Sequence, residues 1–144
     1  VAAPEPAAGE VLVRTEASSL NPVDWKTRAW QVGPPLPATL GWDLSGRVVE
    51  SDDSAHEVGA RVIAMSAQIA TGRGTWAELV ALPGHLLAPA PATVPLADAA
   101  ALPLAGTTAV QALRATGLST GERILVVGAV GGLVVQLARL TGAH

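Results

Sequence analysis

The sequence predicts a mixed α/β protein, in which a β-rich first part precedes the start of a doubly wound parallel sheet. Three observations predict this class. Residues 1–96 contain short strand-like segments separated by proline and glycine. Alanine-rich stretches that favour helices follow. An apolar run at residues 123–127 then precedes a glycine turn and another helical segment. We therefore divide the chain into residues 1–96 and 97–144.

The first part contains four segments with the apolar and β-branched character of strands. They are residues 10–16, 44–50, 61–65 and 76–82. Residues 19–40 are rich in proline, and we predict an irregular connection there. Strands at this spacing are typical of a small antiparallel barrel or sandwich.

The second part is predicted to alternate helices with one buried strand. Helices are expected at residues 96–102, 107–115 and 133–140, the first of them capped by Thr93 or Asp98. Residues 123–127 form a continuous apolar run, which indicates a parallel strand buried on both faces. This order of elements is that of an opening βα unit.

A glycine turn joins that strand to the last helix, through Gly128, Ala129, Val130, Gly131 and Gly132. Glycines let the backbone turn sharply and approach a pyrophosphate closely. The following helix offers free N–H groups and a partial positive charge. The spacing G-x-x-G-G departs from the usual G-x-G-x-x-G, so the turn alone fits a simple tight connection equally well. The acidic residue expected to hold a ribose hydroxyl, about 20 residues later, would lie beyond His144.

Composition excludes several other classes. The net charge of the 144 residues is −3, with both signs interspersed, which argues against a nucleic-acid or anionic-membrane surface. We find neither an apolar run of membrane-spanning length nor a signal-peptide pattern at the start. The absence of cysteine excludes disulfides and thiolate zinc sites, and it fits a reducing compartment. We therefore expect a cytoplasmic protein. Because the sequence does not begin with Met, we also expect the natural start to lie upstream of Val1.

Six segments spread over the whole chain carry a further pattern: residues 6–13, 21–26, 41–46, 72–78, 99–109 and 135–139. Together and in this order they resemble the zinc-free quinone oxidoreductase (zeta-crystallin-like) branch of the medium-chain dehydrogenases/reductases. The resemblance implies that residues 1–96 are an incomplete GroES-like substrate domain. It implies that residues 97–144 begin a Rossmann domain, with the active site in the cleft between the two domains.

The resemblance also implies an enzyme that transfers hydride from NADPH, or from NADH, to a quinone or an α,β-unsaturated carbonyl, and that forms a homodimer. Asn21 and Asp24 fall on the pocket segment of the family and are the candidate catalytic residues. Asn21 would contact substrate or nicotinamide, and Asp24 would brace the loop. Without the resemblance, this segment reads as a turn. For Asp43, in an apolar context, we expect a structural hydrogen bond rather than a substrate contact.

The cofactor residues follow from the same resemblance. Thr108 falls where the family has a threonine near the nicotinamide, although by itself it would read as a helix cap. The pyrophosphate loop corresponds to Gly128, Ala129, Val130, Gly131, Gly132 and Leu133. These positions are therefore our candidate cofactor-binding residues.

No metal site is predicted. Zinc alcohol dehydrogenases of the same superfamily use cysteine and histidine ligands near these positions. Here there is no cysteine, and Trp42 stands where the histidine is expected. Without a Lewis acid a plain ketone is harder to reduce. An enone or quinone remains accessible because conjugation spreads the developing negative charge, while the cofactor carries the hydride.

Two other interpretations remain open. A non-catalytic member of the fold could bind cofactor or quinone as a sensor or structural protein, and an enoyl reductase of a biosynthetic pathway is a third possibility. The chain is also shorter than the family pattern at both ends and in three loops, at residues 29–35, 50–58 and 128–132. We expect residues of a longer protein to be missing at these places, which interrupted Cα spacing would reveal.

Overall fold

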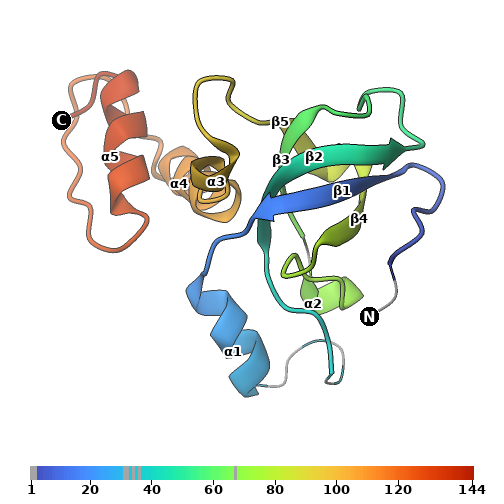
Figure 1. The fold of residues 1–144 in the computed structure, drawn as a ribbon. Coiled ribbons are helices and arrows are strands. Elements are labelled where there is room, and N and C mark those ends of the chain that lie inside the picture. The colour runs from blue at the N-terminus through green and yellow to red at the C-terminus, as the bar shows by residue number, and fades with distance from the viewer. Residues whose placement is uncertain (1–2, 31–32, 34, 36, 67) are drawn as a thin grey trace. The chain divides into compact units, whose positions relative to one another are not determined.

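The computed structural model describes residues 3–30, 33, 35, 37–66 and 68–144. It divides into two compact units, Val1–Pro103 and Leu104–His144. The first unit holds one five-stranded sheet in the order β4-β1-β2-β3-β5, with every neighbouring pair antiparallel (Figure 1). The strands are β1 (Glu10–Ala17), β2 (Asp43–Ser51), β3 (Arg61–Met65), β4 (Leu79–Pro83) and β5 (Leu87–Pro89). The predicted mixed α/β class with an antiparallel first part is confirmed.

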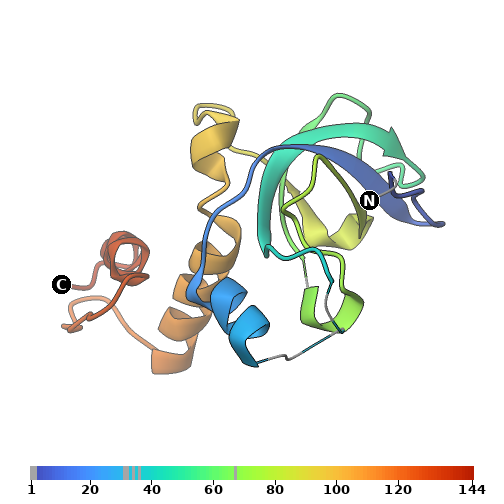
Figure 2. The same cartoon turned by 60° about the horizontal axis from the view of Figure 1, so that its bottom comes forward.

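Helices complete both units. The first unit contains α1 (Pro22–Trp30), α2 (Gln68–Thr71), the 3₁₀ helix η1 (Gly84–Leu86) and α3 (Leu96–Ala99). The second is built from α4 (Pro103–Thr116), which begins at the boundary, and α5 (Gly131–Leu140). Figure 2 shows the curvature of the sheet, with α1 outside it directly after β1.

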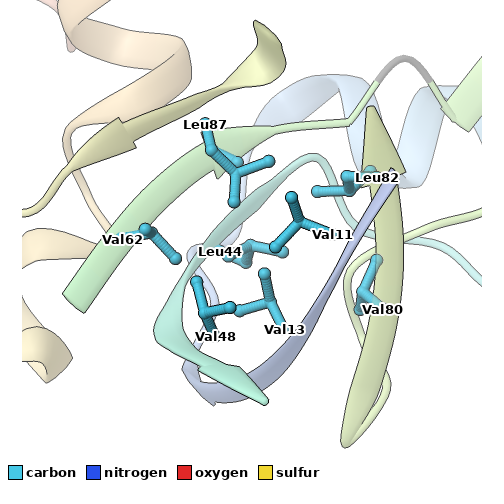
Figure 3. Packing of buried hydrophobic residues seen from close by; sticks show 9 residues of the cluster. Val11, Val13, Leu44, Val48, Val62, Val80, Leu82 and Leu87 are labelled. Atoms are coloured by element: carbon cyan, nitrogen blue, oxygen red, sulfur yellow. The ribbon is translucent and has the colours of Figure 1, made fainter. Parts of the chain in front are cut away.

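The core of the first unit lies on the inner side of this curved sheet. Val11 and Val13 alternate along β1, and neither is exposed to solvent. They pack in one cluster with side chains from each of the strands β2, β3, β4 and β5 (Figure 3). The buried cluster comprises Val11, Val13, Leu44, Val48, Val62, Ala64, Val80, Leu82 and Leu87. The period-two pattern that predicted the strands is therefore the pattern that fills the core.

Residues 19–40 were expected to be irregular, and for α1 this prediction is wrong. The helix begins at Pro22, whose fixed φ suits a first helical position. Asp24 then reaches back, and its Oδ2 accepts the backbone N–H of Asn21 at 2.6 Å. That is half of a capping box, with Asn21 just before the helix. The short loop expected at residues 29–35 lies partly outside the described residues.

Two strands also differ from the prediction. We placed a strand at residues 76–82, but β4 begins only at Leu79. The amide of Thr75 donates instead to the carbonyl of Gly41 at 3.0 Å, and that of Trp76 to Leu40 at 2.9 Å. The three-residue strand β5 was not predicted, because so short a segment carries almost no alternation.

Helix boundaries in the second half shift for local reasons. Helix α3 ends at Ala99, and Pro95 precedes it without any side-chain cap, so the predicted capping by Thr93 or Asp98 is wrong. Helix α4 starts at Pro103, four residues before the predicted start, because proline fits the first turn. The last predicted helix is confirmed as α5, which begins two residues earlier than expected.

Residues 123–127 do not form the predicted strand. A parallel strand needs hydrogen-bonded neighbours on its edges, and no described residue of the second unit belongs to a strand. Leu125 is 90% exposed and Val127 88% exposed, although both have the apolar character of buried positions. One pair of hydrogen bonds is nevertheless present. His144 donates its N–H to the Glu122 carbonyl at 2.8 Å, and the Ile124 N–H donates to the His144 carbonyl at 2.9 Å.

Candidate functional site

A polar cluster lies in the first unit where β1 ends and where β2 and α1 begin. We call it the amide–carboxylate cluster. Its members are Ser18, Ser19, Asn21, Asp24, Asp43 and Thr75. The structure thus brings the two predicted catalytic residues, Asn21 and Asp24, together with Asp43.

Asp43 is the centre of this cluster and has no exposure to solvent. Its Oδ2 accepts a very short hydrogen bond from the Ser19 hydroxyl and a 2.8 Å bond from Nδ2 of Asn21. Nδ2 of Asn21 also donates to the Ser19 oxygen at 3.0 Å. The structural hydrogen bonding expected of Asp43 is confirmed. A buried carboxylate is tolerated here because polar donors surround it.

The loop that ends before β4 closes the cluster on another side. Ser18 donates to the backbone carbonyl of Asp43 at 2.6 Å, and its Oγ lies 3.2 Å from the hydroxyl of the fully buried Thr75. Gly41 faces this hydroxyl with φ of 105°, and a Cβ there would lie only 2.5 Å from it. Glycine is required at this position for both reasons.

Asp24 is the second buried carboxylate, 2% exposed. Burial raises its pKa above the ordinary 3.8, the hydrogen bond from the Asn21 backbone opposes that rise, and the charge of Asp43 adds to it. The Oδ2 atom of Asp24 carries the Asn21 bond, whereas its Oδ1 is buried without a partner. Asn21 is therefore bonded to one carboxylate through its backbone and to the other through its side chain.

Sequence reasoning missed Ser18, Ser19 and Thr75. A usable signal existed for the two serines, since paired hydroxyls directly follow β1 and come just before Asn21. Thr75 carried no such signal. Its contact with Ser18 joins residues 57 positions apart, and only the folded sheet brings them together.

In the second unit, five of the seven predicted cofactor residues line one hollow of about 340 Å³. Thr108, Gly128, Ala129, Val130 and Gly131 line it, together with apolar side chains of α4 and residues 124–127. Gly132 and Leu133 do not line the hollow. Thr108 is not a helix cap, because it lies in the second turn of α4 and donates to the Leu104 carbonyl at 2.8 Å.

The glycine turn has the backbone geometry that its sequence suggests. Gly128 has φ of 124°, which a residue with a Cβ rarely adopts. The N–H of Gly131 donates to the Gly128 carbonyl at 3.0 Å, and that of Leu133 to the Val130 carbonyl at 3.1 Å. Within the described part of the chain, the amide of Gly132 has no acceptor. It lies at the N-terminus of α5, where the helix dipole favours negative charge.

Two features are absent from the described residues. These residues contain no group of three or more histidine, aspartate or glutamate side chains that could hold a metal ion. Among the helices that the structure describes, none is long and apolar enough to cross a membrane.

Comparison with known proteins decides the family. Residues 7–92 match the model of the alcohol dehydrogenase GroES-like domain. The chain belongs to this family. It is 40% identical over 159 aligned positions to a chloroplast envelope quinone oxidoreductase homolog of Arabidopsis thaliana, matching all of this chain and 48% of that relative. It is 37% identical to an NADPH-dependent alkenal/one oxidoreductase of the same plant, over 96% of this chain and 39% of that protein.

Solved structures agree with this family. An alcohol dehydrogenase superfamily protein from Novosphingobium aromaticivorans superposes with a TM-score of 0.91 at 37% identity, over 99% of this chain and 46% of that one. The quinone oxidoreductase of Thermus thermophilus, solved also with NADPH, gives 0.82 at 34% identity, over 99% and 45%. The predicted resemblance to medium-chain quinone oxidoreductases is confirmed. The chain spans about half the length of the curated relatives it matches.

Proposed function

We propose that the protein transfers hydride from NADPH to a quinone or an α,β-unsaturated carbonyl, without zinc. One observation carries the proposal: Asn21 lies between two buried carboxylates in a chain whose relatives are named quinone and alkenal/one oxidoreductases. Such a fixed amide is suited to orienting a carbonyl. NADPH, or NADH in its place, would supply the hydride.

In this proposal, residues 1–96 form the GroES-like substrate domain and residues 97–144 begin a dinucleotide-binding domain. The hydrogen bonds of His144 support the second assignment. The N–H of His144 donates to Glu122, and its carbonyl accepts from Ile124; these two residues flank Arg123. Such a pattern of hydrogen bonds is that of one rung of a parallel ladder. The rung follows a glycine turn and a helix, as in a βαβ unit.

Each candidate residue then has a role. Asn21 orients the carbonyl, and Asp24 braces the start of α1 through its bond to the Asn21 backbone. Gly128, Ala129, Val130, Gly131, Gly132 and Leu133 hold the pyrophosphate, for which the open amide of Gly132 is suited. Thr108 lies near the nicotinamide.

The absence of cysteine and the presence of Trp42 instead of histidine support zinc-independent chemistry. An activated double bond or quinone needs no Lewis acid to accept hydride, and water can supply the proton. We further propose that the protein is cytoplasmic, because the cysteine-free composition fits a reducing compartment. We also propose that it forms a homodimer, as the family resemblance implies.

The rival function is a sensor or structural member that binds without turnover. The G-x-x-G-G spacing favours it, because the loop is shorter than the usual fingerprint. Oxidation of NADPH by the intact protein, measured with a panel of quinones and enones, separates the two. The proposal fails if cofactor binds and no compound is reduced.

Gly132→Ala tests the loop separately. A Cβ at Gly132 meets no atom within 4 Å, so the fold should accept alanine in this helical position. The added methyl would obstruct a pyrophosphate approaching the loop, and we expect NADPH to bind at least tenfold more weakly. Arg139→Ala, near the other end of α5, is the matched control and should bind normally. Equal affinities in both variants would remove the loop from the cofactor site.

A further inference from the structure

The hydrogen bonds around Asn21 define which of its polar atoms are used. Nδ2 donates to Ser19 Oγ and to Asp43 Oδ2, and these two acceptors are themselves hydrogen-bonded to each other. Three mutually bonded atoms form a small triangle, so the acceptors lie within about 60° of each other as seen from Nδ2. The two hydrogens of an amide diverge by about 120°. One N–H therefore points between both acceptors, and the second N–H points elsewhere.

The same geometry fixes the orientation of the amide. Rotating the side chain by half a turn would place Oδ1 of Asn21 against the carboxylate of Asp43, which is fully buried and accepts only. Ser19 adds to this selection. Its proton is given to Asp43, so its oxygen offers only lone pairs to Asn21.

We propose that Asp43 and Ser19 are positioning residues that hold the Asn21 amide with one N–H and the Oδ1 atom free for a carbonyl-bearing ligand. The inference rests on the proposed function. The free N–H would donate to a carbonyl oxygen, either on the reducible substrate or on the carboxamide of the cofactor. Asp43 and Ser19 would act only through Asn21, without touching the ligand.

A double-mutant cycle in the intact protein tests this dependence. Asp43→Asn keeps the size of the side chain but removes the bias on the amide orientation. We expect a loss of about tenfold or more in kcat/KM, and a similar loss for Asn21→Ala. The double variant should be within about twofold of Asn21→Ala alone. If Asp43→Asn lowers kcat/KM tenfold in the Asn21→Ala background as well, or not at all in the native background, the proposal is overturned.

Ser45→Ala is the matched structural control. Ser45 is also fully buried on β2, two residues from Asp43, but its hydroxyl donates to the Leu96 carbonyl at 2.5 Å. Its loss should lower the melting temperature and leave kcat/KM within about twofold. A tenfold loss of activity in Ser45→Ala would show that any buried change here impairs catalysis, and would overturn the specific role of Asp43.

Two measurements separate the remaining cases. If Asn21→Ala weakens NADPH binding, the free N–H serves the cofactor carboxamide; if only the substrate KM or kcat changes, it serves the substrate carbonyl.

An NMR spectrum tests the orientation of the Asn21 amide independently of turnover. Asn21, the only asparagine of this sequence, should show one downfield amide proton and one ordinary one. Asp43→Asn should abolish the downfield shift. Two protons at ordinary amide shifts in the native protein, with neither moved downfield, would overturn the inference even in an active enzyme.

Discussion

Gly46 is the position where substitution should damage the sheet most directly. It lies in β2 and pairs with Thr15 of β1 at a register shift. A Cβ at Gly46 would lie 2.2 Å from the Arg14 carbonyl oxygen and 2.9 Å from Cγ1 of Val13. Ordinary contact begins near 3.4 Å, so β1 would have to retreat by about 1 Å. We expect the substitution to break two ladder hydrogen bonds, at about 1 kcal/mol each, and to cost a further ~1 kcal/mol by displacing the packing at Val13. The free energy of unfolding would then fall by roughly 3 kcal/mol.

We therefore expect Gly46→Ala to lower the free energy of unfolding by about 3 kcal/mol, or the melting temperature by roughly 10 °C. Urea denaturation followed by circular dichroism measures it. Gly106→Ala is the control: this glycine lies inside α4 with nothing within 4 Å of a Cβ, and alanine should add about 0.5–1 kcal/mol. A loss below about 1 kcal/mol for Gly46→Ala would refute the contact argument.

Two further predictions concern one buried and one half-buried polar side chain, Asp24 and Arg61. Because burial raises the pKa of Asp24, its ionised form costs stability at neutral pH, and that cost disappears as the pH falls through the raised pKa. Asp24→Asn keeps an acceptor for the Asn21 amide, so it should be at least as stable at pH 7. Its advantage should shrink toward pH 4 in thermal melts; a pH-independent difference would contradict this. Arg61 donates to the carbonyls of Pro91 and Val94 at 3.2 and 2.5 Å. Arg61→Met should cost about 1–3 kcal/mol and increase proteolysis between residues 90 and 95, whereas unchanged cleavage there would exclude this anchoring role.

Much of the first unit could be predicted because its signals are local. Strand β3 has the predicted bounds, and β1 extends the prediction by one residue. In both strands, the alternating apolar residues that define the strand also enter the core, Val11 and Val13 from β1 and Val62 and Ala64 from β3. Helix α1 was predictable too: Asn21, Pro22 and Asp24 form a helix-start signature that was interpreted as a turn. The error came from giving proline more weight as a helix breaker than its position warranted.

The site was only half predictable, for a different reason. Asn21 and Asp24 could be named because the short segment that contains both resembles the pocket segment of the family. The hydrogen bonds of Ser19 to Asp43 join positions 24 residues apart, and those of Ser18 to Thr75 join positions 57 apart. Such contacts depend on which segments become neighbours in the folded sheet, and the pattern within one segment does not specify its neighbours. Residues that join the cluster through contacts between distant segments, such as Ser18 and Thr75, are therefore the ones that sequence reasoning misses.

Residues 123–127 are the place where the strand prediction is wrong although the sequence has the expected apolar pattern. The apolar run that predicted a buried strand is present, yet Leu125 and Val127 remain almost fully exposed and no strand forms at these described residues. A parallel ladder needs repeated hydrogen bonds. In the described part of the second unit, the backbone hydrogen bonds between the two segments are those of His144 with Glu122 and Ile124, and that of Gly121 with Gly142.

If the segment belongs to a dinucleotide-binding domain, further rungs should form beside it in the intact protein. Hydrogen exchange can test this, because ladder amides exchange slowly while unpaired ones do not. We expect the amides of residues 125–127 to be protected at least a hundredfold in the intact protein and unprotected in a fragment that ends at His144. Fast exchange in the intact protein would mean that the exposed apolar side chains have no sheet to enter, and the assignment of residues 97–144 would fail with it.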